Sequence, residues 1–192
     1  MGEVDKGLVP WRGKPLVEHV RDRFAPQVGG LLISANRNPE RYAVYGAVLA
    51  DDAALGPWQG PLAGVAAGLA AAATPWVAVA PCDTPCLPLD LVSRLAHAIA
   101  DTGAPLAVAG AHGRRHSVCM LLAVSLLPDL LDYLHRGSRR VDTWQARVRA
   151  VEVPFDGEDG FFNINTPEQL ADKEGSHDKQ APGAGGAGPG GG

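Results

Sequence analysis

The residue whose type and position most clearly suit a chemical role is Asp83, which directly follows a short apolar segment. It lies in the run Pro81-Cys82-Asp83-Thr84-Pro85, so two prolines restrict the backbone around it. A carboxylate held in this way could bind a metal ion against a phosphate group without moving. A helix cap or an ordinary loop carboxylate accounts for the same position about equally well. Position alone therefore does not decide between a functional and a structural role.

Two other predicted strands also end in polar residues. Asn36-Arg37-Asn38 follows the strand expected at 31–35, and Asp51-Asp52 follows the one expected at 47–50. Ligands bind beyond the carboxyl ends of the strands in parallel sheets, so these loops and the loop with Asp83 should meet. Two of the three supply carboxylates, and Mg²⁺ is usually held by one or two carboxylates plus substrate phosphates. The sequence thus predicts a magnesium site at this edge of the sheet.

Short apolar segments alternate with helical patterns, which is typical of an α/β protein with a mostly parallel sheet covered on both sides. The segment 76–80, WVAVA, has the composition of a strand buried on both faces. The expected strands are 31–35, 47–50, 76–80, 106–109, 118–123 and 151–155. The expected helices are 15–24, 40–45, 62–73, 88–100, 126–134 and 141–148, with another starting at the Thr166 cap.

The composition favours one folded domain. A length of 192 residues is typical of a single domain, and an apolar content of 46% is enough for a core. We expect the domain to span residues 1–174. A flexible Gly/Pro/Ala-rich tail is expected at 175–192, where no bulky apolar residue occurs.

Charge and cysteine content speak against several classes of protein. Lys and Arg number 17 against 21 Asp and Glu, and the net charge of −4 gives no long-range attraction to nucleic acid. The three cysteines do not make a disulfide framework. The uncharged stretch 53–82 contains four prolines, and its helical part, 62–73, is too short to cross roughly 30 Å of hydrocarbon. With no basic-then-apolar leader in the sequence, we expect a cytoplasmic protein without nucleic-acid or membrane partners.

Several motifs, each weak alone, follow one another along residues 1–173. They are MGEVDKGL from Met1, WRGKPL from Trp11, SANR from Ser34, Asp51-Asp52, GPLAG from Gly60, PCDTP from Pro81, His116, and NINTPE from Asn163. In kind and order these motifs resemble those of the MobA-like nucleotidyltransferases.

The resemblance implies a Rossmann-like three-layer α/β/α fold of the nucleotidyltransferase type. It implies transfer of GMP from GTP to the molybdopterin-bound molybdenum cofactor, with release of pyrophosphate. On the pterin side it places His116, Asn163 and Asn165. Transient contact with molybdenum cofactor biosynthesis proteins or target molybdoenzymes is a further expectation.

On the nucleotide side, the resemblance places Lys6 at the phosphates, Asp52 at the GTP, and Asp83 at both GTP and Mg²⁺. Asp83 and Lys6 are thereby the expected catalytic residues. Ser34 is the fourth expected GTP-binding residue, where the family commonly has Asn. A hydroxyl can keep one hydrogen bond but not the paired donor and acceptor of an amide.

The start of the sequence also departs from the family pattern. The family opens with a strand and a glycine-rich loop of the form LAGGxSxRMGxDK, whereas this sequence opens at the Met-Gly of that motif, so that the first strand and most of the loop are missing. A start assigned too far downstream or a truncated chain would account for this. We expect the chain as written to bind GTP poorly, and a chain extended upstream to bind it well.

Two alternative functions remain open. One is a related enzyme that uses CTP or another pterin or sugar-phosphate acceptor, because base choice depends on the missing loop and on Ser34. The other is a non-catalytic nucleotide or cofactor binder that has lost its phosphate loop. The glycines at 60–64 lack GxGxxG spacing, and no GK[ST] or GxSxG motif occurs, which speaks against dehydrogenases, P-loop ATPases and α/β-hydrolases.

Overall fold

The computed structural model describes residues 5–51, 60–156 and 160–162. Asp52, Asn163, Asn165, the helix start at Thr166 and the tail expected at 175–192 lie outside these residues. The helices are α1 (Leu16–Phe24), α2 (Pro39–Tyr42), α3 (Pro61–Ala71), α4 (Leu91–Thr102), α5 (Leu127–His135) and α6 (Val141–Arg147), with 3₁₀ turns η1 (Lys6–Leu8), η2 (Ala25–Gln27) and η4 (Val124–Leu126). The strands are β1 (Pro10–Trp11), β2 (Lys14–Pro15), β3 (Leu32–Ser34), β4 (Ala47–Leu49), β5 (Trp76–Val79), β6 (Leu106–Ala111), β7 (Arg114–Ala123) and β8 (Val151–Pro154).

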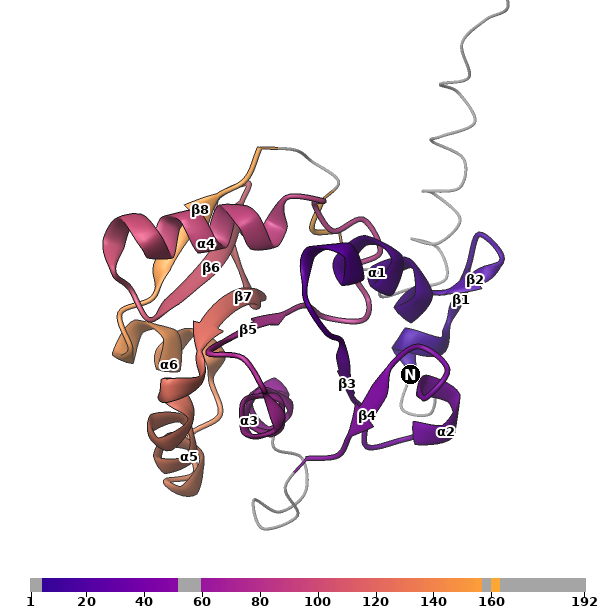
Figure 1. Ribbon diagram of the computed structural model, residues 1–192, viewed down its shortest axis with the longest axis horizontal. Coiled ribbons are helices and arrows are strands. Elements are labelled where there is room, and N and C mark those ends of the chain that lie inside the picture. The colour runs from indigo at the N-terminus through magenta and orange to yellow at the C-terminus, as the bar shows by residue number, and fades with distance from the viewer. Residues whose placement is uncertain (1–4, 52–59, 157–159, 163–192) are drawn as a thin grey trace, which may run out of the picture.

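The largest sheet has four strands in the order β5-β7-β6-β8 (Figure 1). β6 and β7 form a hairpin whose turn residues, His112 and Gly113, have φ values of 52° and 68°, as in the tight turns that join antiparallel strands. β7 therefore runs antiparallel to β6 and also to β5, whereas β6 and β8 are parallel. β3 and β4 form a separate parallel pair, and β1 and β2 a short antiparallel one. The expected α/β class is confirmed, although strand pairing in the four-stranded sheet is mixed.

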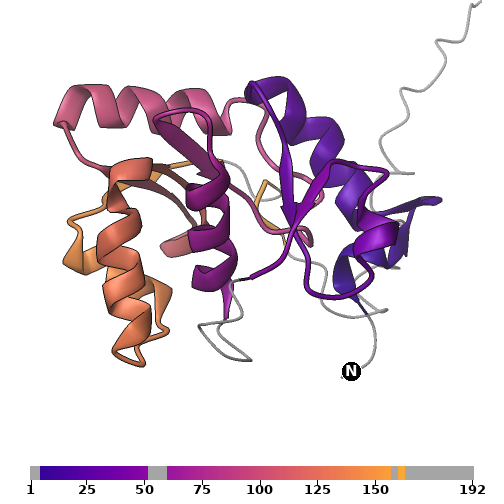
Figure 2. The same ribbon diagram turned by 60° about the horizontal axis from the view of Figure 1, so that its bottom comes forward.

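Alternate residues of the central strands face two helical layers. On one face, Leu106 and Val108 of β6 pack with α3, α5 and Trp144 of α6. On the other face, Ala107 and Ala109 of the same strand pack with α1 and α4. The alternation follows from the two-residue period of a strand. The result is the expected three-layer arrangement, in which α4 covers one side of the sheet while α3 and α5 lie next to one another on the other (Figures 1 and 2).

Most expected helices are confirmed to within a few residues. α3 begins one residue before the predicted start, and α4 begins at Leu91 rather than at residue 88. α4 ends at Thr102 and is followed by Gly103, whose φ of 69° is the left-handed conformation that glycine adopts readily after a helix. None of the helices in the described ranges is long and apolar enough to cross a bilayer.

β5 is less buried than its WVAVA sequence predicts. Trp76 is 39% exposed, and the rest of the strand is only half-buried. Within the described residues, β5 pairs only with β7, and β3, whose Leu32 is 42% exposed, pairs only with β4. The prediction that both faces are covered is confirmed, because Val77 and Val79 pack against one core cluster and Ala78 against the other. The burial is only partial, because a strand whose second edge is unpaired among the described residues is open to solvent along that side.

The core around β6 sets the stability of the fold. We expect Leu106→Ala, at a position with no exposed surface, to lower the free energy of unfolding by about 2–5 kcal/mol, because it removes apolar contacts and leaves a cavity. Leu89→Ala is the matched control, since Leu89 is 65% exposed, and we expect a change below about 0.5 kcal/mol. Urea unfolding of both variants measures the difference, and similar losses at the two positions would contradict this view of the core.

Candidate functional site

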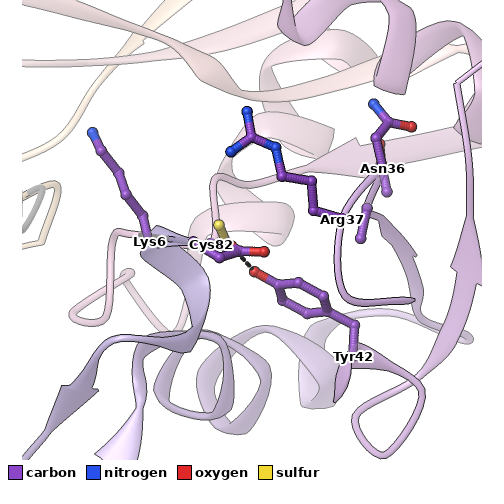
Figure 3. Close-up of a pocket in the computed structure, with 8 residues that line it drawn as sticks. Lys6, Asn36, Arg37, Tyr42 and Cys82 are labelled. Atoms are coloured by element: carbon purple, nitrogen blue, oxygen red, sulfur yellow. Dashed lines mark hydrogen bonds between the residues drawn. The ribbon is translucent and has the colours of Figure 1, made fainter. Parts of the chain in front are cut away.

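A pocket of about 310 Å³ lies where the loops after β3 and β5 meet the turn η1 (Figure 3). Its lining residues are Asp5, Lys6, Ser34, Ala35, Asn36, Arg37, Tyr42 and Cys82. The prediction that polar loops after β3 and β5 come together is therefore confirmed. Figure 3 also shows that Lys6 of η1 and Arg37 of the loop after β3 extend in the same direction, so two cationic side chains belong to one site.

Lys6 and Asp83, the two expected catalytic residues, lie side by side. The Lys6 ammonium is 3.8 Å from the nearer Asp83 carboxylate oxygen. Lys6 belongs to the turn η1 and lines the pocket, whereas Asp83 lies in the loop after β5 and is not among the lining residues. The Lys6 side chain is 53% exposed, whereas that of Asp83 is 16% exposed. An ion pair this long, with the lysine half exposed to water, is weak, so the lysine can turn toward an incoming anion at little cost.

Burial raises the pKa of Asp83 above its ordinary value, and the neighbouring Lys6 charge only partly opposes that rise. A carboxylate that has lost water without gaining a close cation binds an added cation readily. No cluster of three or more His, Cys, Asp or Glu suited to a metal ion occurs in the described ranges. One carboxylate still fits Mg²⁺, which commonly takes one or two protein carboxylates and completes its shell with substrate phosphates and water.

Ser34 ends β3 beside the loop that follows β4. Its hydroxyl donates to Asp51 at 3.4 Å, and the Asn36 amide donates to the other Asp51 carboxylate oxygen at 2.7 Å. The Asp51 backbone N–H donates in return to the Asn36 side-chain oxygen at 2.9 Å. The two loops are thus joined through Asn36 and Asp51, neither of which we predicted as a site residue, although both lie in the polar runs after strands. Asp52, the expected GTP-binding residue, lies outside the described residues.

His116 lies on β7 and does not line this pocket. Its ring stacks on Phe161, with ring centroids 4.5 Å apart and an interplanar angle of 19°. Burial, with the nearby charges of His112 and Arg114, lowers the pKa of His116, so the ring is neutral at pH 7. Phe161 comes two residues before Asn163, so His116 packs against the chain that leads to the expected pterin-side asparagines, which are outside the described residues.

The cysteines near the site are unreactive. Burial and the nearby Asp83 carboxylate raise the pKa of Cys82 to about 11, and the same two causes raise that of Cys119 to about 12. Both are therefore thiols at neutral pH and poor nucleophiles. The site is therefore suited to bind an anionic ligand through the charges of Lys6 and Arg37 rather than to react with it covalently.

Residues 1–150 match the family model of the MobA-like NTP transferase domain. The chain is 47% identical over 175 residues to a molybdenum cofactor guanylyltransferase of Cupriavidus taiwanensis, an alignment that covers 88% of this chain and 87% of the relative. It is also 47% identical over 168 residues to a guanylyltransferase of the same name from Yersinia pseudotuberculosis, with 87% and 85% covered.

Two solved structures share the fold. Molybdopterin-guanine dinucleotide biosynthesis protein A of Archaeoglobus fulgidus is 22% identical, with a TM-score of 0.73 and 93% of each chain covered. The 2-C-methyl-D-erythritol 4-phosphate cytidylyltransferase of Thermus thermophilus is 18% identical, with a TM-score of 0.68 and coverage of 90% of this chain and 94% of the other.

Proposed function

The chain belongs to the MobA-like NTP transferase family, and we propose that it transfers GMP from GTP to the molybdopterin-bound molybdenum cofactor, which yields the guanine dinucleotide form of the cofactor and pyrophosphate. The observation that carries the proposal is the ion pair between Lys6, which lines the pocket, and Asp83, which directly follows the lining residue Cys82 in the loop after β5. The 47% identity to a molybdenum cofactor guanylyltransferase supports GTP, rather than another nucleoside triphosphate, as the substrate.

The reaction needs positioning and charge stabilisation rather than an enzyme nucleophile. The terminal phosphate of the pterin substrate attacks the α-phosphorus of GTP, forming a new phosphorus–oxygen bond. The bond between the α-phosphorus and the oxygen bridging to the β-phosphate breaks, and its electrons leave on pyrophosphate. Lys6 provides a compact positive charge against the oxygens where this negative charge grows.

Asp83 is the residue that would hold Mg²⁺, and when bound the ion would neutralise charge on the nucleotide phosphates. Ser34, at the end of β3, and Asp52 would orient the nucleoside. His116, whose ring stacks on Phe161, would contact the pterin substrate together with Asn163 and Asn165.

The proposed reaction also suggests the cell compartment, the substrates and the partner proteins of the enzyme. We propose a cytoplasmic enzyme whose substrates are GTP and the molybdenum cofactor. Its product would pass on through transient contacts with cofactor biosynthesis proteins or recipient molybdoenzymes. A net charge of −4 gives no support to a nucleic-acid partner.

A direct assay tests the proposal. The purified chain, both as written and extended upstream by a strand and glycine-rich loop, is mixed with molybdenum cofactor, Mg²⁺ and either GTP or CTP. Pyrophosphate release and dinucleotide product are both measured, and the extended chain should give more product because it should bind GTP better. We expect guanine dinucleotide from GTP and a rate with CTP lower by at least about tenfold. Faster product formation from CTP would indicate a cytidylyltransferase. Binding of GTP by calorimetry without any product, in chains with and without an upstream strand and glycine-rich loop, would indicate a non-catalytic binder.

A further inference from the structure

We propose that Tyr42 and Asn38 are positioning residues, which hold the Asp5 carboxylate and through it fix the turn η1 that presents Lys6. The proposal rests on the role of Lys6 in the proposed function. It assigns to α2 and the residue before it a part in the reaction that acts through Lys6. Because Tyr42 also lines the pocket, the test below distinguishes this part from a direct contact with the substrate.

The Asp5 carboxylate is held by two donors. The Tyr42 hydroxyl donates to one oxygen, and the Asn38 side-chain amide donates to the other at 3.2 Å. Hydrogen bonds to a charged acceptor are among the stronger ones in proteins. Tyr42 is only 4% exposed, and its ring packs with Leu8 and Val17. Its burial raises the pKa of the Tyr42 hydroxyl, as does the bond to Asp5, so the group stays protonated and remains a donor.

Asp5 in turn begins the turn that carries Lys6. The Leu8 N–H donates to the Asp5 carbonyl oxygen at 3.0 Å, and the Val9 N–H donates to that of Lys6 at 3.1 Å. Asp5 is therefore bound both through its side chain, to α2 and Asn38, and through its backbone, to the turn. A shift of its carboxylate moves the backbone of the next residue, Lys6.

The other side of the turn is packed against the same tyrosine. A Cβ atom added to Gly7 would lie 2.5 Å from the Tyr42 hydroxyl oxygen and 3.1 Å from the Cys82 sulfur. The backbone at Gly7 thus approaches both side chains more closely than any other residue type permits. Because Cys82 precedes Asp83, this contact brings the Lys6 turn against the turn of its acidic partner, and the 3.8 Å pair follows.

The backbone conformation of Asn38 suits this residue to its role of holding the Asp5 carboxylate. Its φ of 48° and ψ of 42° are left-handed values, which asparagine adopts more readily than most residues. The same residue thus ends the loop after β3, precedes α2 and directs an amide at Asp5. Fixing the base of a long, flexible lysine limits the positions that its ammonium group can reach, which lowers the entropy lost when it meets a phosphate.

Tyr42→Phe removes the hydroxyl but keeps the buried ring, and Tyr45→Phe is the matched control on the same short segment. We expect Tyr42→Phe to lower kcat/KM for GTP-dependent transfer by about tenfold. In a chain that already carries Lys6→Ala, the same change should have less than about a twofold effect, because the residue it positions is gone. Tyr45→Phe should leave kcat/KM unchanged. An equal loss with and without Lys6, or an equal loss from Tyr45→Phe, would overturn the proposal.

Hydrogen exchange separates this proposal from the proposed function. We expect the Leu8 and Val9 amides to exchange about tenfold faster in Tyr42→Phe than in the parent chain, and at the parent rate in Tyr45→Phe. If the parent chain shows no transfer from GTP, the proposed function fails while the exchange data still test the contact. Unchanged exchange in Tyr42→Phe would refute the positioning role whatever the activity.

Discussion

Asp83→Asn should lower the rate of GTP-dependent transfer by at least about 100-fold without weakening the fold, because it removes a preorganised charge but keeps the shape of the side chain. The substitution affects rate and stability differently because the Asp83 carboxylate is poorly solvated in the folded chain. With 16% exposure and a partner at 3.8 Å, it is neither freely hydrated nor closely paired.

The direction of the stability change in Asp83→Asn follows from the raised pKa of Asp83. Burial raises the pKa of Asp83 in the folded state, so between the ordinary value and the raised value the folded chain binds more protons than the unfolded chain. Stability therefore falls as pH rises through that window and stays lower above it. Asn carries no charge, so at neutral pH the variant should be at least as stable as the parent. Lowering the pH to about 4, near the ordinary pKa of aspartate, should narrow the difference.

The measurements are transfer kinetics and urea unfolding at the two pH values. Asp101→Asn is the matched control, since it makes the same chemical change on an exposed position of α4. It should leave transfer unchanged. Transfer within about threefold of the parent rate in Asp83→Asn would refute the metal-binding role of this carboxylate, and a clear loss of stability at neutral pH would refute the electrostatic account.

The features that were predicted correctly from the sequence are those encoded within short segments. The helices, most strands and the polar loops after β3 and β5 each follow from a pattern within a few residues, and the structure brings the loops together as the strand-end rule requires. Lys6 and Asp83 are a different case, because no spacing relates two residues so far apart. The family resemblance assigned both residues to the nucleotide but did not predict that they touch, and the 3.8 Å contact emerges only from the structure.

The parts that sequence reasoning missed depend on neighbours that a segment does not encode. WVAVA shows that β5 is apolar, but not that one edge of the strand is unpaired among the described residues. α2 has four residues, too few for any periodicity to show which side faces the turn η1. The bond from Tyr42 to Asp5 therefore emerges only from the folded chain.

Lys6→Ala should lower transfer about 100-fold, a loss comparable with that at Asp83, because the charge faces oxygens on which negative charge grows during the reaction. The loss should lie mainly in kcat, since an interaction that strengthens in the transition state affects the chemical step more than binding. Lys6→Arg should recover part of the rate, because it keeps the charge but not the compact shape. Lys14→Ala is the matched control, because Lys14 is similarly exposed and its ion pairs with Glu18 and Asp22 lie away from the pocket.

The same variant also tests whether Lys6 and Asp83 act as a pair. The Lys6 charge lowers the pKa of Asp83 against the larger effect of burial, so its removal should raise that pKa further. A protonated Asp83 cannot hold a metal ion, and the acid side of the kcat/KM profile should therefore move to higher pH in Lys6→Ala and stay in place in Lys14→Ala. If Lys6→Ala slows transfer with no movement of this limb, the lysine acts on the phosphates alone and the coupling to Asp83 is disproved. If the limb moves in both lysine variants, net charge rather than the 3.8 Å contact controls the carboxylate.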